Sequence, residues 1–209
     1  MRVGFHSAGR SVAGMFGLLA VVGSSLALAP AAQAQDAISG ACGRDYDRGV
    51  IHIDGDVNKP VELTAAKLAA LPGQETLNIT FLNHLGAAQS HSETGPTLWT
   101  ALNIAAGGIK VPPPTPNEYV GEPAAITTLY VMVIGTDGYE TLISEAEIDP
   151  QFGNAPILLG WAEDDVVLDK VPYNSEEFKG PAQLVVPTDS HGGRYANQIC
   201  RIKVLNGAL

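Results

Sequence analysis

The sequence predicts an α+β domain in which β-structure dominates. Segments with the apolar alternation or the apolar runs of β-strands outnumber the segments with helical spacing. The helical segments are short and scattered along the chain, which favours a mixed α+β architecture around a dominant sheet. The composition, with 45% apolar and 16% charged residues, is that of a globular protein and not of a disordered or fibrous one.

The first elements are expected between residues 49 and 82. Residues 49–54 (GVIHID) alternate apolar and polar side chains and predict a strand. Residues 63–71 predict a helix with Thr64 as its N-cap, and Pro72-Gly73 stops it. Residues 75–82 (ETLNITFL) alternate again and predict a half-buried strand.

A loop, a helix and a second loop are expected next. Residues 83–95 are polar and predict an irregular loop. Residues 97–106 place apolar side chains at helical spacing, and Gly107-Gly108 ends that helix. Residues 111–123 hold five prolines and predict a stiff, polyproline-like surface loop, which offers a contact surface for a protein partner.

The middle of the chain predicts a hairpin, a short helix and a strand. Residues 125–134 form an apolar, β-rich run, and Asp137-Gly138 is a tight-turn signal that leads into a partner strand at 139–142. Residues 144–147 (SEAE) match a capping box and predict a short helix that ends by Pro150. Residues 157–162 predict another apolar strand.

The last part of the chain predicts two strands separated by loops. Residues 164–180 form an acidic, irregular connection, and residues 183–186 a strand that Pro187 closes. Residues 188–193 are polar and contain glycine, as is typical of a loop, and residues 195–204 predict the final strand.

The N-terminus has the layout of a secretory signal peptide. Arg2 and Arg10 precede a long apolar stretch, and the small-residue site Ala32-Gln33-Ala34 follows it. A membrane anchor is the alternative, but glycines and serines dilute the stretch and no basic flank closes it. We therefore expect a signal peptide at 1–34, a lead-in at 35–48 and one domain at 49–209, in a periplasmic or secreted protein that leaves the membrane after cleavage. Arg10 is followed by Ser11, so the signal has no twin arginine.

The net charge of the chain argues against nucleic acid as a partner. It holds 12 Lys and Arg against 22 Asp and Glu, a net charge of −10. Removal of the first 34 of the 209 residues takes away two bases and no acid, which leaves 175 residues with a net charge of −12. An acidic surface of this size repels phosphate backbones, so we expect no binding of nucleic acid.

Cys42 and Cys200 are the two cysteines of the chain. In an oxidising compartment they most simply form a disulfide between the N-terminal segment and the last strand. A metal site is the weaker alternative because the sequence has no CxxC or Cys/His cluster. A lipid on Cys42 is a third interpretation, but the preceding Ser39-Gly40-Ala41 lacks the usual leucine.

Histidines and one arginine mark the candidate chemistry. His84 and His91 lie in the polar segment 83–95, which also contains Glu93. A His/His/Glu metal site is one interpretation, but the spacing fixes no ligand geometry, and we favour exposed polar residues. Ser190-His191 beside Asp189 is a weak match to a hydrolase triad, because adjacent residues rarely face one another as nucleophile and base.

Arg194 is notable in a chain with few bases. It could hold an anion, and a surface salt bridge is the simpler interpretation.

Five segments occur in an order that resembles a known family. They are Val61-Glu62-Leu63-Thr64 with Leu68-Ala69-Ala70-Leu71-Pro72; Gly95-Pro96-Thr97-Leu98-Trp99-Thr100-Ala101-Leu102 with Ala106-Gly107-Gly108-Ile109; Thr136-Asp137-Gly138-Tyr139; Ile148-Asp149-Pro150 with Ala155-Pro156-Ile157-Leu158-Leu159; and Gly180-Pro181-Ala182-Gln183-Leu184-Val185-Val186-Pro187 with Gly192-Gly193-Arg194-Tyr195. This order resembles the molybdopterin-binding domain of the sulfite oxidase type. The resemblance implies an α+β fold with a mixed, partly barrel-like β-sheet and short helices. In the enzymes of that family, one cysteine thiolate holds a pterin-bound molybdenum that transfers oxygen atoms or reduces oxidised substrates.

The sequence departs from that family in three ways. The metal-ligating cysteine should follow the strand 75–82, but the segment there is Phe81-Leu82-Asn83-His84-Leu85-Gly86, and a neutral imidazole does not replace a soft thiolate. Gln183 stands where the closing motif has an arginine. Molybdenum cofactors are normally inserted before export of the folded protein, a route that needs the twin arginine.

The resemblance and its departures lead to one hypothesis and one rival. We expect an exported domain that acts as a binding or accessory module and has lost molybdenum redox chemistry. Its pocket would be formed by the loop 83–95, the turn 137–139 and the loop 189–194, with His84, His91, Tyr139, His191 and Arg194 as ligand-binding residues. The rival is an active molybdopterin-dependent oxidoreductase with an unusual metal ligand set.

Overall fold

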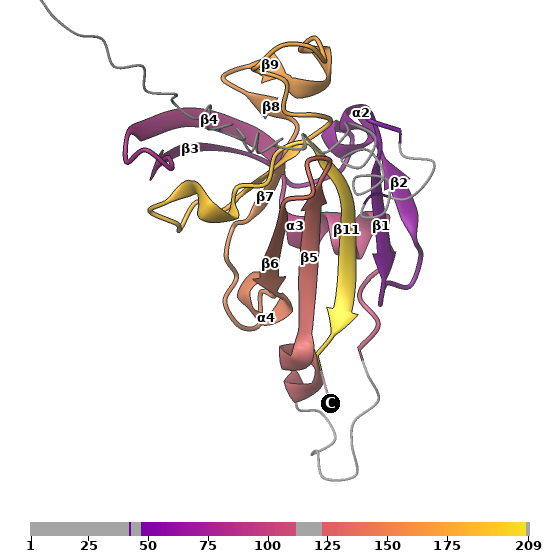
Figure 1. Cartoon of the computed structure of the whole chain (residues 1–209). Helices are drawn as coiled ribbons and strands as arrows, with labels where there is room; N and C mark the ends of the chain where they lie inside the picture. Colours follow the sequence, from indigo (N-terminus) through magenta and orange to yellow (C-terminus); the bar gives the residue numbers. More distant parts are fainter. Residues whose placement is uncertain (1–41, 43–46, 112–122, 208–209) are drawn as a thin grey trace, which may run out of the picture. The chain divides into compact units, whose positions relative to one another are not determined.

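The computed structural model describes residue 42 and residues 47–111 and 123–207 (Figure 1). These residues all belong to one compact unit, residues 31–209. Its strands form sheets of five, four and two strands, and its helices are short. The predicted α+β class with a dominant sheet is therefore confirmed, but no closed barrel is formed by the residues that the structure describes.

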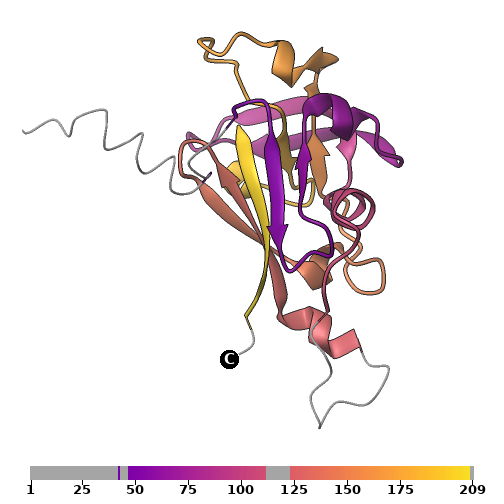
Figure 2. The same ribbon diagram turned by 90° about the vertical axis from the view of Figure 1, so that its right-hand side faces the viewer.

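The last strand of the chain lies at the centre of the five-stranded sheet. Its order is β2 (Val61–Leu63), β1 (Ile51–Gly55), β11 (Ile199–Asn206), β5 (Leu129–Gly135) and β6 (Glu140–Ser144). β11 runs parallel to β1 and antiparallel to β5, and it lies between them (Figure 2). The sheet is thus mixed, as expected.

The five-stranded sheet supplies much of the main core. Alternate residues of its strands point to one face, so Ile51 and Ile53 on β1, Val131 on β5 and Ile202 on β11 are buried in one large apolar cluster. Burial of such side chains contributes about 1.5–3 kcal/mol each relative to leaving them in water.

Two short helices lie at the predicted positions. In α2 (Ala65–Ala69) the Thr64 side chain accepts a hydrogen bond from the Lys67 amide at 3.2 Å, which is the predicted N-cap. The helix predicted at 97–106 begins as α3 (Leu98–Thr100) and continues as a π-helical turn, η1 (Ala101–Ala105).

The segment 83–95 is not a loop, and this corrects the sequence analysis. Residues 88–96 form strand β4 (Ala88–Pro96), which pairs along its whole length with β3 (Gln74–Leu82). The expectation failed because β4 has no apolar alternation. Its ladder is lined instead by pairs of hydroxyl side chains, such as Thr76 with Thr94 and Thr80 with Ser90, each at 2.9 Å.

β3 and β4 belong to the four-stranded antiparallel sheet. Its order is β3, β4, β8 (Ala162–Glu163) and β9 (Val166–Val167). β7 (Leu158–Gly160) pairs separately with β10 (Gln183–Val185), so the single strand predicted at 157–162 is divided between two sheets. Gly95 lets β4 approach β7 closely, because a Cβ at this position would lie 2.1 Å from the carbonyl oxygen of Leu159.

Smaller differences concern the ends of elements. The predicted strand 125–134 begins with a 3₁₀ helix, η2 (Pro123–Thr128), and the predicted final strand 195–204 begins later, at Ile199. The connection 164–180, expected to be irregular, contains β9 and a 3₁₀ turn, η3 (Leu168–Lys170).

The capping-box prediction is right in place and wrong in mechanism. α4 (Glu145–Ile148) starts after Ser144, but the Ser144 side chain makes no capping hydrogen bond. Glu145, the first residue of this helix, is buried.

The predicted disulfide is present between Cys42 and Cys200, whose Cα atoms lie 5.5 Å apart. It ties the segment before β1 to β11. The proline-rich segment 111–123 lies outside the described residues apart from its two ends, so its role as a partner surface remains a prediction. No helix among the described residues is long and apolar enough to span a membrane.

Candidate functional site

A pocket of about 540 Å³ lies where the three predicted segments meet. The end of β3 and its turn, the turn before β6, and the loop with the 3₁₀ turn η4 (Gly192–Arg194) each contribute to it. Its lining consists of Phe81, Leu82, Asn83, His84, Glu93, Asp137, Tyr139, Glu163, Lys179, Gln183, His191, Gly192, Gly193, Tyr195 and Asn197.

One side of the pocket is a connected group of ionisable side chains. Glu93, on β4, is only 1% exposed, and its Oε2 accepts a hydrogen bond of 2.7 Å from Gln183 Nε2. The same nitrogen lies 2.9 Å from Glu163 Oε2, which also accepts a hydrogen bond from the Lys179 ammonium. The amide of Gln183 therefore bridges two carboxyl groups from neighbouring strands.

The two carboxyl groups have pKa values shifted in opposite directions. Burial, and then the adjacent Glu163, raise the pKa of Glu93 to about 8. Burial also acts to raise the pKa of Glu163, but hydrogen bonds from Lys179 and Gln183 outweigh it and leave that pKa below its usual value. At neutral pH Glu93 is thus mainly a neutral acid, and Glu163 carries the negative charge.

Another side of the pocket is aromatic. The rings of Phe81 and Tyr195 stack with their centroids 4.4 Å apart. The Tyr195 hydroxyl donates to the carbonyl of Val186 at 3.1 Å, and burial raises the pKa of Tyr195 to about 12, so the phenol stays neutral. Gly192 lets the loop lie against this wall, because a Cβ there would be 2.9 Å from the Phe81 ring.

Three of the five predicted site residues line this pocket: His84, Tyr139 and His191. The Tyr139 hydroxyl donates to the carbonyl of Gly193, which joins the hairpin turn to the loop of η4. Ser190 Oγ lies 3.1 Å from His191 Nδ1. The structure thus brings together the three segments that the sequence analysis placed around one pocket.

Arg194 lies outside the lining of this pocket, in an ion-pair network. Its guanidinium makes two hydrogen bonds of 2.8 and 2.7 Å to Asp189 and two of 3.1 and 3.0 Å to Glu147. Asp189 is therefore occupied by Arg194, and the triad considered for Ser190, His191 and Asp189 is not assembled. Two carboxylates already balance the charge of Arg194, as in the salt-bridge interpretation.

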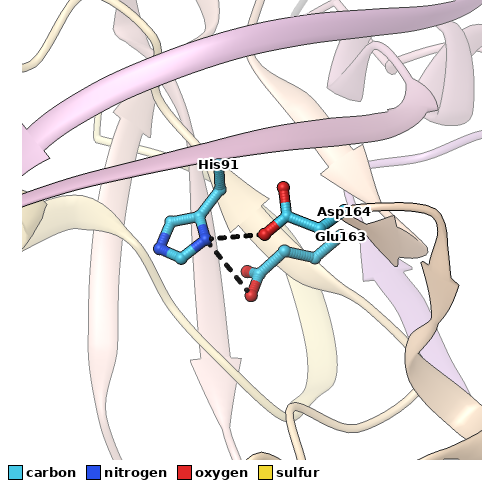
Figure 3. Close-up of side chains that lie close together, drawn as sticks. All are labelled: His91, Glu163 and Asp164. Atoms are coloured by element: carbon cyan, nitrogen blue, oxygen red, sulfur yellow. Dashed lines mark hydrogen bonds and ion pairs between the residues drawn. The ribbon is translucent and has the colours of Figure 1, made fainter.

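His91 also lies outside the lining of the pocket, and its contacts differ from those considered in the sequence. Its Nδ1 is 3.2 Å from Asp164 Oδ2 and 3.6 Å from Glu163 Oε1 (Figure 3). Within the described part of the chain, these three residues form the one group of at least three potential metal-ligating side chains whose donor atoms lie within 4.8 Å of one another. The group does not include His84 or Glu93.

Sequence reasoning missed the residues that give the pocket its charge. Glu93 was assigned to an exposed loop, and Glu163 and Lys179 lie at a strand end and in a polar connection with no motif around them. Gln183 was noted only as the replacement of an arginine. In the structure, the amide of Gln183 contacts the carboxyl groups of Glu93 and Glu163.

The donor set does not fit a thiolate-held molybdenum. The chain has two cysteines, and both are in the disulfide, so no thiolate remains to bind the metal. Among the described lining residues, Lys179 is the single Lys or Arg, and Glu163 binds it. This lining offers an anionic cofactor no unpaired permanent cation.

No family model matches the chain, and no curated protein matches it. Among solved structures, the sulfane dehydrogenase SoxCD from Paracoccus pantotrophus is similar, with a TM-score of 0.53 and 15% sequence identity. The match covers 78% of this chain and 40% of that one, so this chain spans less than half of the protein that it resembles. At this identity the likeness concerns the fold alone. Together with the ordered motifs, it suggests a sulfite oxidase-type molybdopterin-binding fold.

Proposed function

We propose that this chain is an exported small-molecule-binding domain on a sulfite oxidase-type scaffold, a binding or accessory module without molybdenum redox chemistry. The proposal rests on the pocket together with the disulfide. A pocket of about 540 Å³ has aromatic and ionisable walls, while both cysteines of the chain are joined to each other. A scaffold with such a pocket and no free thiolate favours binding over metal-centred redox chemistry.

The charges of the pocket select the class of ligand. At neutral pH Glu93 is mainly protonated, Glu163 and Lys179 compensate one another, and Asp137 adds a negative charge. The summed charge favours a cation over an anion. The stacked pair of Phe81 and Tyr195 offers a surface for a ring. The ligand class that fits best is a small, ring-bearing cation.

The disulfide supports export. A covalent link between Cys42 and Cys200 persists in oxidising compartments and is rare in the reducing cytosol. The signal-like N-terminus is consistent with the same interpretation.

The first experiment is elemental analysis for molybdenum, with pterin fluorescence after denaturation, on protein purified from its native extracytoplasmic fraction. We expect neither molybdenum nor pterin in stoichiometric amounts. Near-stoichiometric molybdenum would overturn the proposal in favour of an active molybdopterin-dependent oxidoreductase whose metal ligand is not a cysteine.

The second experiment tests the ligand class with two probes that share a ring. Isothermal titration should show benzamidine, a cation, binding at least about tenfold more tightly than benzoate, because one attractive and one repulsive charge contact easily differ by about 1.4 kcal/mol. Asp137→Asn should reduce this preference, and Glu176→Gln, at an exposed carboxylate outside the pocket lining, should leave it unchanged. Equal binding of the two probes, or tighter binding of benzoate, would exclude a cation-selective pocket.

A further inference from the structure

His91, Glu163 and Asp164 converge from two neighbouring strands and a turn. His91 lies on β4, Glu163 ends β8, and Asp164 begins the turn between β8 and β9 (Figure 3). Their donor atoms lie within 4.8 Å of one another. We propose that these three side chains form a binding site for a divalent transition-metal ion of the Zn²⁺ class. The site goes beyond the proposed ligand pocket and does not depend on it.

The backbone and one carboxylate oxygen hold Asp164 in place. Its amide donates to the carbonyl of Ser92 at 2.8 Å, and its Oδ1 accepts from the amide of Ser92 at 2.8 Å. These two bonds fix the turn against β4 and leave Oδ2 directed at the imidazole of His91. One oxygen of the carboxylate therefore orients the group, and the other faces the site.

The two carboxylate oxygens of Glu163 also have different partners. Its Oε2 accepts hydrogen bonds from Lys179 and Gln183, on the pocket side. Its Oε1 faces His91 Nδ1 at 3.6 Å. The outer-shell partners that position a metal ligand are thus already present for both carboxylates.

The separations between donor atoms suit a shared ion. Two donors that each lie about 2.1 Å from a tetrahedral ion are about 3.4 Å apart. His91 Nδ1 lies 3.2 Å from Asp164 Oδ2 and 3.6 Å from Glu163 Oε1, so the two observed distances bracket that value. The donor atoms of the third pair, Glu163 and Asp164, also lie within 4.8 Å of each other.

The local charge favours a divalent cation. The group brings together the carboxylates of Glu163 and Asp164, Asp165 follows in the turn, and Lys179 is the cation bound to Glu163. One imidazole and two carboxylates favour Zn²⁺ over the hard ions Mg²⁺ and Ca²⁺, which prefer oxygen donors alone.

The site is open on one side. The Asp164 side chain is 57% exposed, whereas that of Glu163 is 15% exposed. Water can therefore supply the fourth position of a tetrahedral ion, and metal can enter without rearrangement of the fold.

Titration of the metal-free, disulfide-intact protein with Zn²⁺ alone, followed calorimetrically and by chelator competition, tests the proposal. We expect one ion per chain with a dissociation constant of about 10 μM or tighter. His91→Ala and Asp164→Asn should each weaken binding at least about tenfold, since the first removes one of three ligands and the second removes the charge of another. Asparagine tolerates the left-handed backbone of Asp164 (φ 49°), so this variant tests the charge while keeping the turn.

His52→Ala is the matched control. His52 Nδ1 lies 3.5 Å from Glu62 Oε1, a histidine–carboxylate pair outside the three-residue group. This variant should bind Zn²⁺ as the unaltered protein does. Absence of Zn²⁺ binding, or equal weakening in the His52 and His91 variants, would overturn the proposal. Neither result would affect the benzamidine experiment, which uses no metal.

Discussion

The five-stranded and four-stranded sheets have different faces and different roles. Strands β1, β5 and β11 direct side chains such as Ile51, Val131 and Ile202 into the main apolar core. Along β3 and β4, the buried side chains are those of Ile79, Glu93 and Pro96. The same backbone architecture thus places an apolar wall in one sheet and an ionisable group in the other.

This difference shows how the domain separates folding from chemistry. The five-stranded sheet gains stability from apolar burial, which requires no partner of a particular charge. The four-stranded sheet holds a buried acid that needs Gln183 and Glu163 beside it. We therefore expect damage to the first sheet to unfold the protein, and damage to the second to change its response to pH and to ligands.

Loss of the disulfide should have the largest effect. The link closes a loop of 158 residues and anchors residue 42 to β11, so Cys42→Ala/Cys200→Ala should lower the free energy of unfolding by about 5 kcal/mol. Urea unfolding measures this loss, and the chemically reduced native chain serves as the comparison. A loss below about 1 kcal/mol would contradict a stabilising role for this cross-link.

An isoleucine-to-alanine substitution in each sheet should show how differently the two sheets contribute to the free energy of unfolding. Ile202→Ala opens a cavity in the main core and should lower the free energy of unfolding by about 4 kcal/mol. Ile79→Ala, in a small cluster with Leu158 and Val185, should lower it by about 2 kcal/mol, because fewer neighbours lose contacts. Guanidinium unfolding of both variants measures the difference, and equal losses would contradict the division of roles.

The change in stability over a single pH unit should be the smallest of these effects and the most specific one. The pKa of Glu93 is raised from 4.5 to about 8 in the folded protein, so the folded state binds more protons than the unfolded state between these values. The Glu93 contribution therefore makes stability fall as pH rises from about 4.5 to 8, by at most about 1.4 kcal/mol per pH unit.

Glu93→Gln should flatten this profile in urea unfolding measured at several pH values. A residual slope of the same sign is expected from Glu145, whose pKa burial raises to about 7 and whose oxygens have no hydrogen-bond partner among the described residues. An unchanged slope in the variant would contradict the assignment of the proton to Glu93.

The sequence predicts the strands of the five-stranded sheet better than those of the four-stranded sheet. The strands of the five-stranded sheet carry apolar alternation or apolar runs, so residues 49–54, 139–142 and 195–204 were placed within a few residues of β1, β6 and β11. β4 carries hydroxyl and charged side chains instead, and its strand was missed because the pairing that holds it comes from β3 and not from its own pattern.

The candidate site was predicted in part for a similar reason. The hairpin signal at Asp137-Gly138 and the polar loop before Tyr195 are local, and Tyr139 and His191 in these segments line the pocket. The partners of Glu93 and His91 come from residues 163, 164 and 183, which lie about 70 to 90 positions away along the chain. Contacts of this separation arise from tertiary pairing and leave no local pattern in a single sequence.

The central place of β11 has a consequence for biosynthesis. Before the ribosome has added residues 199–206, the hairpins β1–β2 and β5–β6 have no strand to join them, because β11 pairs with both β1 and β5. Closing the sheet requires contacts between residues about 150 positions apart, which are slow to form. The nascent chain therefore emerges without its central strand, and the five-stranded sheet cannot be completed until synthesis is nearly finished.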